Sequence, residues 1–231
     1  KKLFEAAGIK EAPKTWDEFT AAAKALTDKS KGQQGFGMIN SWAAGVIHPF
    51  ASLLASNGGE LVGADGKPQL DSAAAKETFA LYESLIKNGY SDPTMGTSDA
   101  NTTGPFLDNF VSGKTGMIIM ANWWESALKT GMGDGFADIA TAPIPVGPKG
   151  DKPRSISYSW MTVVNAKASP DEQAAAWDFL NWLNGPTSGP NGASAMGDIL
   201  MSMGILPSRT SDGVAFQSKL AGDDFLKGYT E

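Results

Sequence analysis

The residues best suited to bind a ligand are two adjacent tryptophans, Trp123 and Trp124. They follow the apolar run Gly116–Met120, which is typical of a short buried strand. Asn122 and Glu125 have the spacing of a capping box, so we expect the strand to lead through a tight turn into a helix. Both indoles would then lie at the carboxyl end of the strand, where open α/β sheets bind ligands. Adjacent residues at a helix start point about 100° apart, so the two indoles are not expected to enter the same core. We therefore expect at least one indole to be a ligand platform, because tryptophan offers a large flat face with a polar group. The alternative is that one indole packs inside and the other rests on the surface.

Other aromatic residues also lie near predicted turns. Trp42 follows one expected strand, and Trp160 lies within another. Aromatic rings can stack on the apolar faces of a ligand, while a few fixed polar groups bind its hydroxyls. The polar neighbours able to do this are Ser41, Asn122, Tyr158 and Ser159. Trp177 and Trp182 lie on a predicted helix and are expected to serve in packing.

The sequence offers little for catalysis. It contains no cysteine, which excludes thiol catalysis and Cys-based zinc sites. It has no Gly-x-Ser-x-Gly elbow and no phosphate-binding glycine loop after a strand, and its Asp-rich spots lack EF-hand spacing. Glu125 beside Trp123 could be one of the two carboxylates of a glycosidase, but its capping position explains it without catalysis. We therefore expect no catalytic residue, no metal site and no cofactor, with a carbohydrate-active hydrolase as the alternative.

The composition limits the kinds of partner. The chain has 231 residues and a formal net charge of -6 without basic clusters, which argues against nucleic acid and anionic membranes. Its 42% hydrophobic content is enough for the core of one large domain or two modest ones. No apolar run is long enough to span a membrane, and no signal-peptide pattern opens the chain. The 7 Trp, 11 Phe and 27 Gly indicate aromatic surfaces on a loop-rich frame, which favours sugar binding.

Strand and helix patterns alternate along the chain, which predicts an α/β fold. Capping boxes at residues 15–18 and 169–172 predict two helix starts. Turn residues predict a hairpin within residues 60–70, and four prolines predict an exposed connector over residues 143–154. The predicted strands are residues 35–39, 116–120, 136–142 and 157–164.

Several stretches in their order along the chain resemble one family. They are Leu3-Phe-Glu-Ala-Ala-Gly-Ile9, Pro13-x-Thr-Trp-Asp-Glu-Phe19, Leu54-Ala-Ser-Asn-Gly-Gly-Glu60, Phe110-Val-Ser-Gly-Lys-Thr-Gly-Met117 with the Trp pair, Pro143-x-Pro-x-Gly-Pro148, and Asn165-Ala-Lys-Ala-Ser169 followed by Ala176-Trp-Asp-Phe-Leu180. Together they resemble the extracellular solute-binding proteins of ABC-type sugar importers, the family that includes maltose-binding protein.

The resemblance implies the periplasmic-binding-protein-like fold, in which two α/β lobes joined by hinge crossings enclose the ligand. Residues 1–154 and 210–231 would belong to the C-terminal lobe, and residues 159–205 to the N-terminal lobe. The hinge crossings would be residues 155–158 and 206–209. Family members begin with a signal peptide and most of the N-terminal lobe, and they usually continue past the last residue here. The sequence therefore resembles a fragment made mainly of the C-terminal lobe.

The resemblance also implies where a ligand would bind. The turns around Trp42 and Trp123 would face the cleft, and the first crossing would lead into Trp160. His48 lies in a cleft-facing segment and Arg209 follows the second crossing, although a structural histidine and a surface salt bridge are the alternatives. The candidate ligand-binding residues are Ser41, Trp42, His48, Asn122, Trp123, Trp124, Tyr158, Ser159, Trp160 and Arg209.

The function implied by the resemblance is binding of a mono- or oligosaccharide and its delivery to the membrane subunits of an ABC permease. The location would be outside the cytoplasm, either periplasmic or lipid-anchored at the cell surface. The complete protein is expected to be a monomer without a nucleic-acid partner. A non-transport carbohydrate-binding module is a further alternative, disfavoured because such modules are usually all-β.

Overall fold

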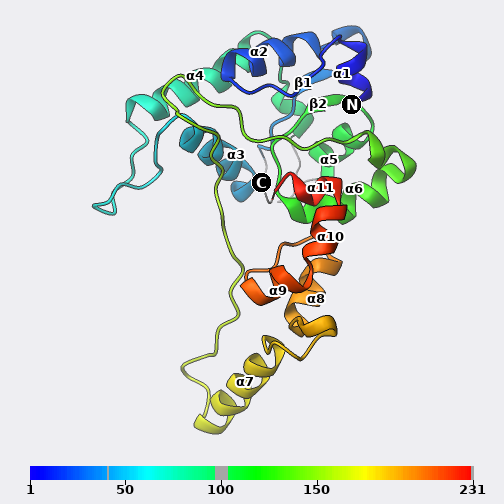
Figure 1. The fold of residues 1–231 in the computed structure, drawn as a ribbon. Coiled ribbons are helices and arrows are strands. Elements are labelled where there is room, and N and C mark those ends of the chain that lie inside the picture. Colours follow the sequence, from blue (N-terminus) through cyan, green and yellow to red (C-terminus); the bar gives the residue numbers. More distant parts are fainter. Residues whose placement is uncertain (41, 97–103, 230–231) are drawn as a thin grey trace. The chain divides into compact units, whose positions relative to one another are not determined.

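The computed structural model describes residues 1–40, 42–96 and 104–229 (Figure 1). The chain forms two compact units. Unit 1 comprises Lys1–Met120 and Leu128–Ile156, and unit 2 comprises Ala121–Ala127 and Ser157–Glu231. Residues 121–127, which carry the tryptophan pair, thus group with the last part of the chain. The lobe boundaries expected from the resemblance place them with the preceding strand instead, and those boundaries stay a prediction.

Unit 1 contains a two-stranded parallel sheet formed by β1 (Gln34–Phe36) and β2 (Thr115–Met117). Gln34 pairs with Thr115 and Phe36 pairs with Met117. Both strands are therefore present where the sequence predicts them, but each is shorter. Parallel strands need a long crossover connection, and here the chain between them forms α3 (Ala43–Ser56), α4 (Ala73–Lys87) and α5 (Gly104–Val111).

The core of unit 1 lies where helices cover this sheet. Phe36 on β1 meets Phe19 of α2 (Trp16–Ala25) edge to face, with ring centroids 5.0 Å apart. Gly35 allows this close packing, because a side chain there would overlap the carbonyl of Ala23. The predicted capping box of α2 is confirmed, since Thr15 accepts from the Glu18 backbone N–H at 3.2 Å. One buried cluster of this core consists of Trp16, Phe19, Ala23, Phe36, Met38, Leu53, Leu81 and Leu85.

Within the first 138 residues, the described part of the chain contains six further helices of eight residues or fewer. They are α1 (Lys2–Ala6), α6 (Glu125–Met132), and the 3-10 helices η1 (Lys29–Lys31), η2 (Pro93–Gly96), η3 (Asn122–Trp124) and η4 (Gly133–Asp138). The predicted hairpin at residues 60–70 is reduced to one antiparallel bridge between Val62 and Pro68. The strand predicted over residues 136–142 is wrong, because its first half belongs to η4.

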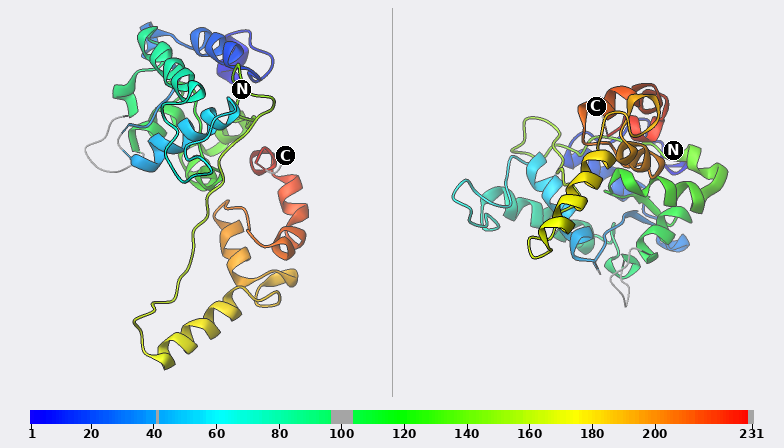
Figure 2. Two further views of the ribbon diagram at one scale, coloured as in Figure 1. Left: turned by 90° about the vertical axis from the view of Figure 1, so that its left-hand side faces the viewer. Right: turned by 90° about the horizontal axis from the view of Figure 1, so that it is seen from below.

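Unit 2 is helical and has no strand within residues 157–229. Its helices are α7 (Pro170–Leu183), α8 (Ala195–Ser202), α9 (Thr210–Ala215), α10 (Gln217–Gly222) and α11 (Asp224–Lys227), with the 3-10 helix η5 (Pro190–Gly192) before α8. Figure 2 shows α7 in yellow and α8–α11 in orange to red. The capping box at Ser169 and Glu172 is confirmed.

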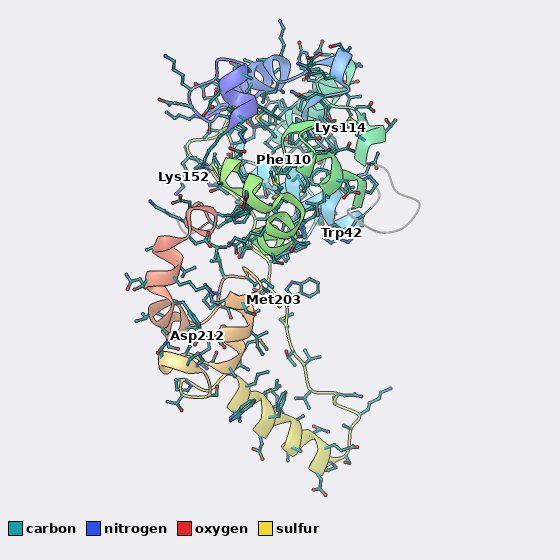
Figure 3. All side chains as sticks on the ribbon, turned by 90° about the vertical axis from the view of Figure 1, so that its right-hand side faces the viewer. Trp42, Phe110, Lys114, Lys152, Met203 and Asp212 are labelled. Carbon is teal, nitrogen blue, oxygen red and sulfur yellow. The ribbon has the colours of Figure 1, made fainter. Side chains whose placement is uncertain are left out.

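A buried carboxylate organises the start of α8. Asp212, on α9, is 2% exposed and accepts from the Ser194 backbone N–H at 2.8 Å and from its hydroxyl at 2.7 Å. Ser194 in turn caps α8 by accepting from the Gly197 N–H. Figure 3 labels Asp212 below Met203, the residue that follows α8. The hydrogen bonds tie α8 and α9 into one substructure.

The strand predicted over residues 157–164 is wrong. The segment has no regular secondary structure and pairs with no strand in the part of the chain that the structure describes. Trp160, Met161 and Val163 are 79–83% exposed. Strand propensity needs neighbouring strands to pair with, and none of the described residues supplies one. The prediction that Trp177 and Trp182 serve in packing is also wrong, because each of these side chains on α7 is 56% exposed.

Candidate ligand-binding site

Side-chain hydrogen bonds tie the stretch of residues 121–127, here called the tryptophan segment, to the rest of unit 2. The amide of Asn122 donates to the carbonyl of Gly204 at 3.0 Å. The indole N–H of Trp123 donates to the hydroxyl of Tyr158 at 2.6 Å. Both hydrogen bonds join residues far apart in sequence. The conformation of the tryptophan segment is therefore held by tertiary contacts.

The expectation that Asn122 caps a helix is wrong. The 3-10 helix η3 begins after Ala121, and no side-chain cap is formed there. The Asn122 amide points instead to the turn that follows α8. Asn122 lies inside η3 and not at the position before it, and its side-chain NH₂ donates to the backbone carbonyl of Gly204.

Gly204 is the residue that lets this turn meet the tryptophan segment. Its φ of +74° lies in the left-handed region that favours glycine at a helix C-terminus. A Cβ at this position would come 2.5 Å from Oε2 and 2.9 Å from Cβ of Glu125. Glu125 is 5% exposed, so its side chain is packed against the glycine backbone. The glycine is thus required both by its dihedral angle and by the close approach of Glu125.

The two indoles have different environments. Trp124 is 3% exposed, whereas Trp123 is only partly buried. Their ring centroids are 5.3 Å apart and the rings are inclined by 46°. One indole is thus packed inside and the other is partly exposed, as in the alternative given from the sequence. Trp124 anchors the segment, while Trp123 keeps accessible ring surface.

Tyr158 belongs to a small group of phenol rings in unit 2. It is 39% exposed. Burial, with a further contribution from the nearby Tyr158, raises the pKa of Tyr229 above its usual value. The Tyr229 ring lies 5.5 Å from that of Phe225. The Tyr229 phenol is therefore a neutral hydrogen-bonding group at physiological pH.

Two candidate residues lie in unit 1, at the start of α3. Trp42 precedes the helix and packs so tightly over Gly45 that a Cβ there would approach its ring to 2.8 Å. Figure 3 labels Trp42 in unit 1. His48 is partly buried, which lowers the pKa of its imidazole, and its backbone carbonyl accepts from the Ser52 hydroxyl at 3.0 Å. Ser41 lies outside the described residues.

The remaining candidates are less enclosed. Ser159 and Trp160 are exposed, Trp160 to 80%. Arg209 precedes α9 and lines an open depression of about 530 Å³ together with Pro207, Thr210 and Gln217. Of the ten residues predicted from the sequence, the structure therefore brings Asn122, Trp123, Trp124 and Tyr158 together in unit 2.

Two residues of this cluster were not predicted. Gly204 follows the predicted helix over residues 193–203, and the general preference for glycine after a helix was the signal available. Tyr229 had no such signal.

Within the described residues there is no group of three or more histidines and carboxylates able to hold a metal ion. No helix among them has the length and apolarity needed to cross a membrane.

Comparison with known proteins identifies related chains. Residues 1–190 match the family of bacterial extracellular solute-binding proteins. The diacetylchitobiose-binding protein DasA of Streptomyces coelicolor is 28% identical over 96% of this chain. A binding protein of Brucella abortus is 30% identical over 79% of it. The chain spans 48% and 42% of the length of these two relatives.

Solved structures agree on the fold. Maltose-bound MalE3 of T. maritima superposes with a TM-score of 0.73 at 22% identity, over all of this chain and 56% of that protein. A ribitol complex from Agrobacterium radiobacter K84 gives a TM-score of 0.71 at 22% identity, over 100% of this chain and 54% of that one. The fold is thus the two-lobe α/β fold of these proteins, and the chain corresponds to about half of it. With its family match over residues 1–190, the chain belongs to the bacterial extracellular solute-binding proteins.

Proposed function

We propose that this chain forms part of a carbohydrate-binding cleft, and that the protein delivers a mono- or oligosaccharide to an ABC-type permease outside the cytoplasm. The observation that carries the proposal is the state of Trp123, a partly exposed indole fixed beside a buried one. A flat, fixed aromatic face suits the C–H surface of a sugar ring. Asn122 and Tyr158 bring polar groups next to it.

The relatives support the class of ligand. One relative is named for diacetylchitobiose, one structural neighbour is bound to maltose and another to ribitol. The family is one of solute-binding proteins, and this supports binding followed by release to a transporter. Ligand capture would then close two lobes about a hinge, driven by the higher affinity of the closed state.

Hydrolysis is the competing function, and the position of Glu125 weighs against it. Glycosidases use two carboxyl groups flanking the scissile bond. Glu125, the carboxylate nearest the tryptophans in sequence, is 5% exposed and packs on the backbone of Gly204. Its burial supports a structural role in holding the tryptophan segment.

The test is carbohydrate binding by Trp123→Ala, measured by calorimetry with maltose, N,N′-diacetylchitobiose and ribitol on the longest form of the protein that its gene encodes. We expect binding to weaken by about 1–3 kcal/mol, the usual loss for an aromatic anchor, with a small change in stability. Trp177→Ala, on exposed α7, is the matched control and should leave affinity unchanged. Unaltered affinity in Trp123→Ala, together with a loss of about 3–5 kcal/mol in unfolding free energy, would make Trp123 a core residue and refute the proposal.

A further inference from the structure

We propose that Asn191 is a site of spontaneous deamidation, at which an isoaspartate forms and loosens the loop before α8. The inference goes beyond the proposed function, because it concerns a covalent change in the chain and no ligand. It starts from the sequence, in which the pair Asn-Gly occurs four times. The four asparagines are Asn57, Asn88, Asn184 and Asn191.

An asparagine followed by glycine can react with its own main chain. The backbone nitrogen of the glycine attacks Cγ of the asparagine, so that an N–Cγ bond forms and the Cγ–Nδ2 bond breaks. The proton of the attacking nitrogen leaves with the amide group as ammonia. Water then opens the cyclic imide at either carbonyl and gives aspartate or isoaspartate, so the net reaction consumes water and releases ammonia. Glycine permits the attack because it has no Cβ to crowd its nitrogen.

Three of the four asparagines are held in place through their side chains. Asn57, Asn88 and Asn184 are the C-cap residues of α3, α4 and α7. The amide of Asn88 donates to the carbonyl of Ser84 at 2.8 Å, and the amide of Asn184 donates to the carbonyl of Leu180 at 2.9 Å. A side chain held in this way must break its hydrogen bond before Cγ can approach the next backbone nitrogen.

Asn57 is held by several contacts and is 0% exposed. Its amide donates to the carbonyl of Ala74 at 3.3 Å and to Oε2 of Glu77 at 3.0 Å. Its side-chain oxygen accepts from the backbone N–H of Lys149 at 3.0 Å. Reaction at Asn57 therefore requires local unfolding of unit 1.

Asn191 lacks these restraints. It is exposed, and its side chain makes no hydrogen bond to any other residue in the described part of the chain. Its φ of +56° is a conformation that asparagine tolerates but does not prefer. The surroundings are open as well, since a Cβ at Gly192 would meet no atom within 4 Å. Asn191 can therefore change its torsion angles without disturbing packed neighbours.

The product would disturb a closed loop. Backbone hydrogen bonds close residues 189–193, from the N–H of Gly189 to the carbonyl of Ala193 at 2.9 Å and from the N–H of Ala193 to the carbonyl of Pro190 at 3.0 Å. Isoaspartate routes the main chain through the former side chain, so it adds a carbon atom to this loop and a carboxylate to its surface. The residue after the loop, Ser194, is 0% exposed and caps α8. We expect the modification to weaken this cap.

The first measurement follows deamidation at each pair by peptide mapping and mass spectrometry during incubation at mildly alkaline pH. In urea the four asparagines should react at similar rates, because each is followed by glycine. In the native protein we expect Asn191 to keep its rate, Asn88 and Asn184 to react about 2- to 10-fold more slowly, and Asn57 to react slower by about 100-fold or more, according to the hydrogen bonds that must break. A native rate at Asn191 as low as those at Asn88 and Asn184 would overturn the assignment.

The second measurement tests the effect on unit 2. Isoaspartyl methyltransferase labels the isoaspartate, and urea unfolding is compared before and after incubation. The midpoint should fall in incubated wild type and in the matched control Asn88→Gln. It should stay in place in incubated Asn191→Gln, because glutamine would have to form a larger ring. Asn191→Asp carries the charge without the additional main-chain carbon and should unfold like fresh wild type.

Two results would refute the loosening of the loop. One is an unchanged midpoint in wild type that has accumulated isoaspartate at residue 191. The other is an equal fall of the midpoint in Asn191→Gln, which would locate the damage elsewhere in the chain.

Discussion

Replacement of Gly204 by alanine should detach the tryptophan segment from the turn after α8. Two costs add at this position. A non-glycine residue at a φ of +74° costs about 1–2 kcal/mol. The new methyl group would also lie 2.5 Å from Glu125 Oε2 and 2.9 Å from its Cβ, and overpacking of this kind costs about 1–3 kcal/mol. We expect a total loss of about 2–5 kcal/mol in the unfolding free energy of unit 2.

A second glycine of unit 2 separates these two costs. Gly192 has a φ of +82°, but a Cβ there would meet no atom within 4 Å. Gly192→Ala should therefore lose only the conformational part, about 1–2 kcal/mol. The difference between the two variants measures the contact between the turn and Glu125. Removing the carboxylate in the double variant Gly204→Ala, Glu125→Ala should recover part of that difference.

The assay is urea unfolding followed by tryptophan fluorescence and by circular dichroism. Trp124 is 3% exposed and should report detachment of the tryptophan segment by a red shift of its emission. Since the chain has two compact units, the two signals are fitted separately rather than to one transition. Equal losses in Gly204→Ala and Gly192→Ala would refute the reasoning, because they would show that the turn does not press on Glu125.

Two further predictions concern titratable side chains, one buried and one partly buried. Asp212→Ala should cost about 2–4 kcal/mol, because the backbone N–H and hydroxyl of Ser194 lose their buried acceptor; urea unfolding checks this, and equal loss in the exposed control Asp178→Ala would contradict it. His48 has a pKa lowered by burial, so the unfolded state takes up a proton first as pH falls. Stability should be fully present above about pH 6.5 and should decrease as pH falls from there through the lower folded-state pKa. His48→Gln should flatten this decrease, and an identical pH profile of unfolding in wild type and variant would show that the histidine is not desolvated.

Local signals in the sequence predicted local structure well. The capping boxes at Thr15 and Ser169 form as expected, because each is satisfied by residues three positions apart. The two strands of unit 1 were placed correctly, since an apolar run between turn residues needs only one parallel neighbour and finds it. Their lengths were not predicted, because the extent of a ladder depends on the partner strand.

Predictions that depended on distant partners failed. Residues 157–164 have the composition of a strand with apolar residues on both faces, as in the interior of a parallel sheet. Such a segment folds as a strand only when neighbours on both sides pair with it, and the described residues provide none. Asn122 failed as a cap because the helix begins one residue earlier than expected, and its side-chain NH₂ donates instead to the distant carbonyl of Gly204.

The candidate site combines both kinds of outcome. Residue type alone identified Trp123 and Trp124 as aromatic surfaces, and helical geometry alone predicted that the two rings would diverge. The tertiary partners of the segment lie far away in sequence: Tyr158 is 35 positions from Trp123, and Gly204 is 82 positions from Asn122. One of these contacts commits the indole N–H of Trp123 to the Tyr158 hydroxyl. A binding residue can thus be nominated from sequence, but its chemistry toward a ligand is set by partners that only the fold brings to it.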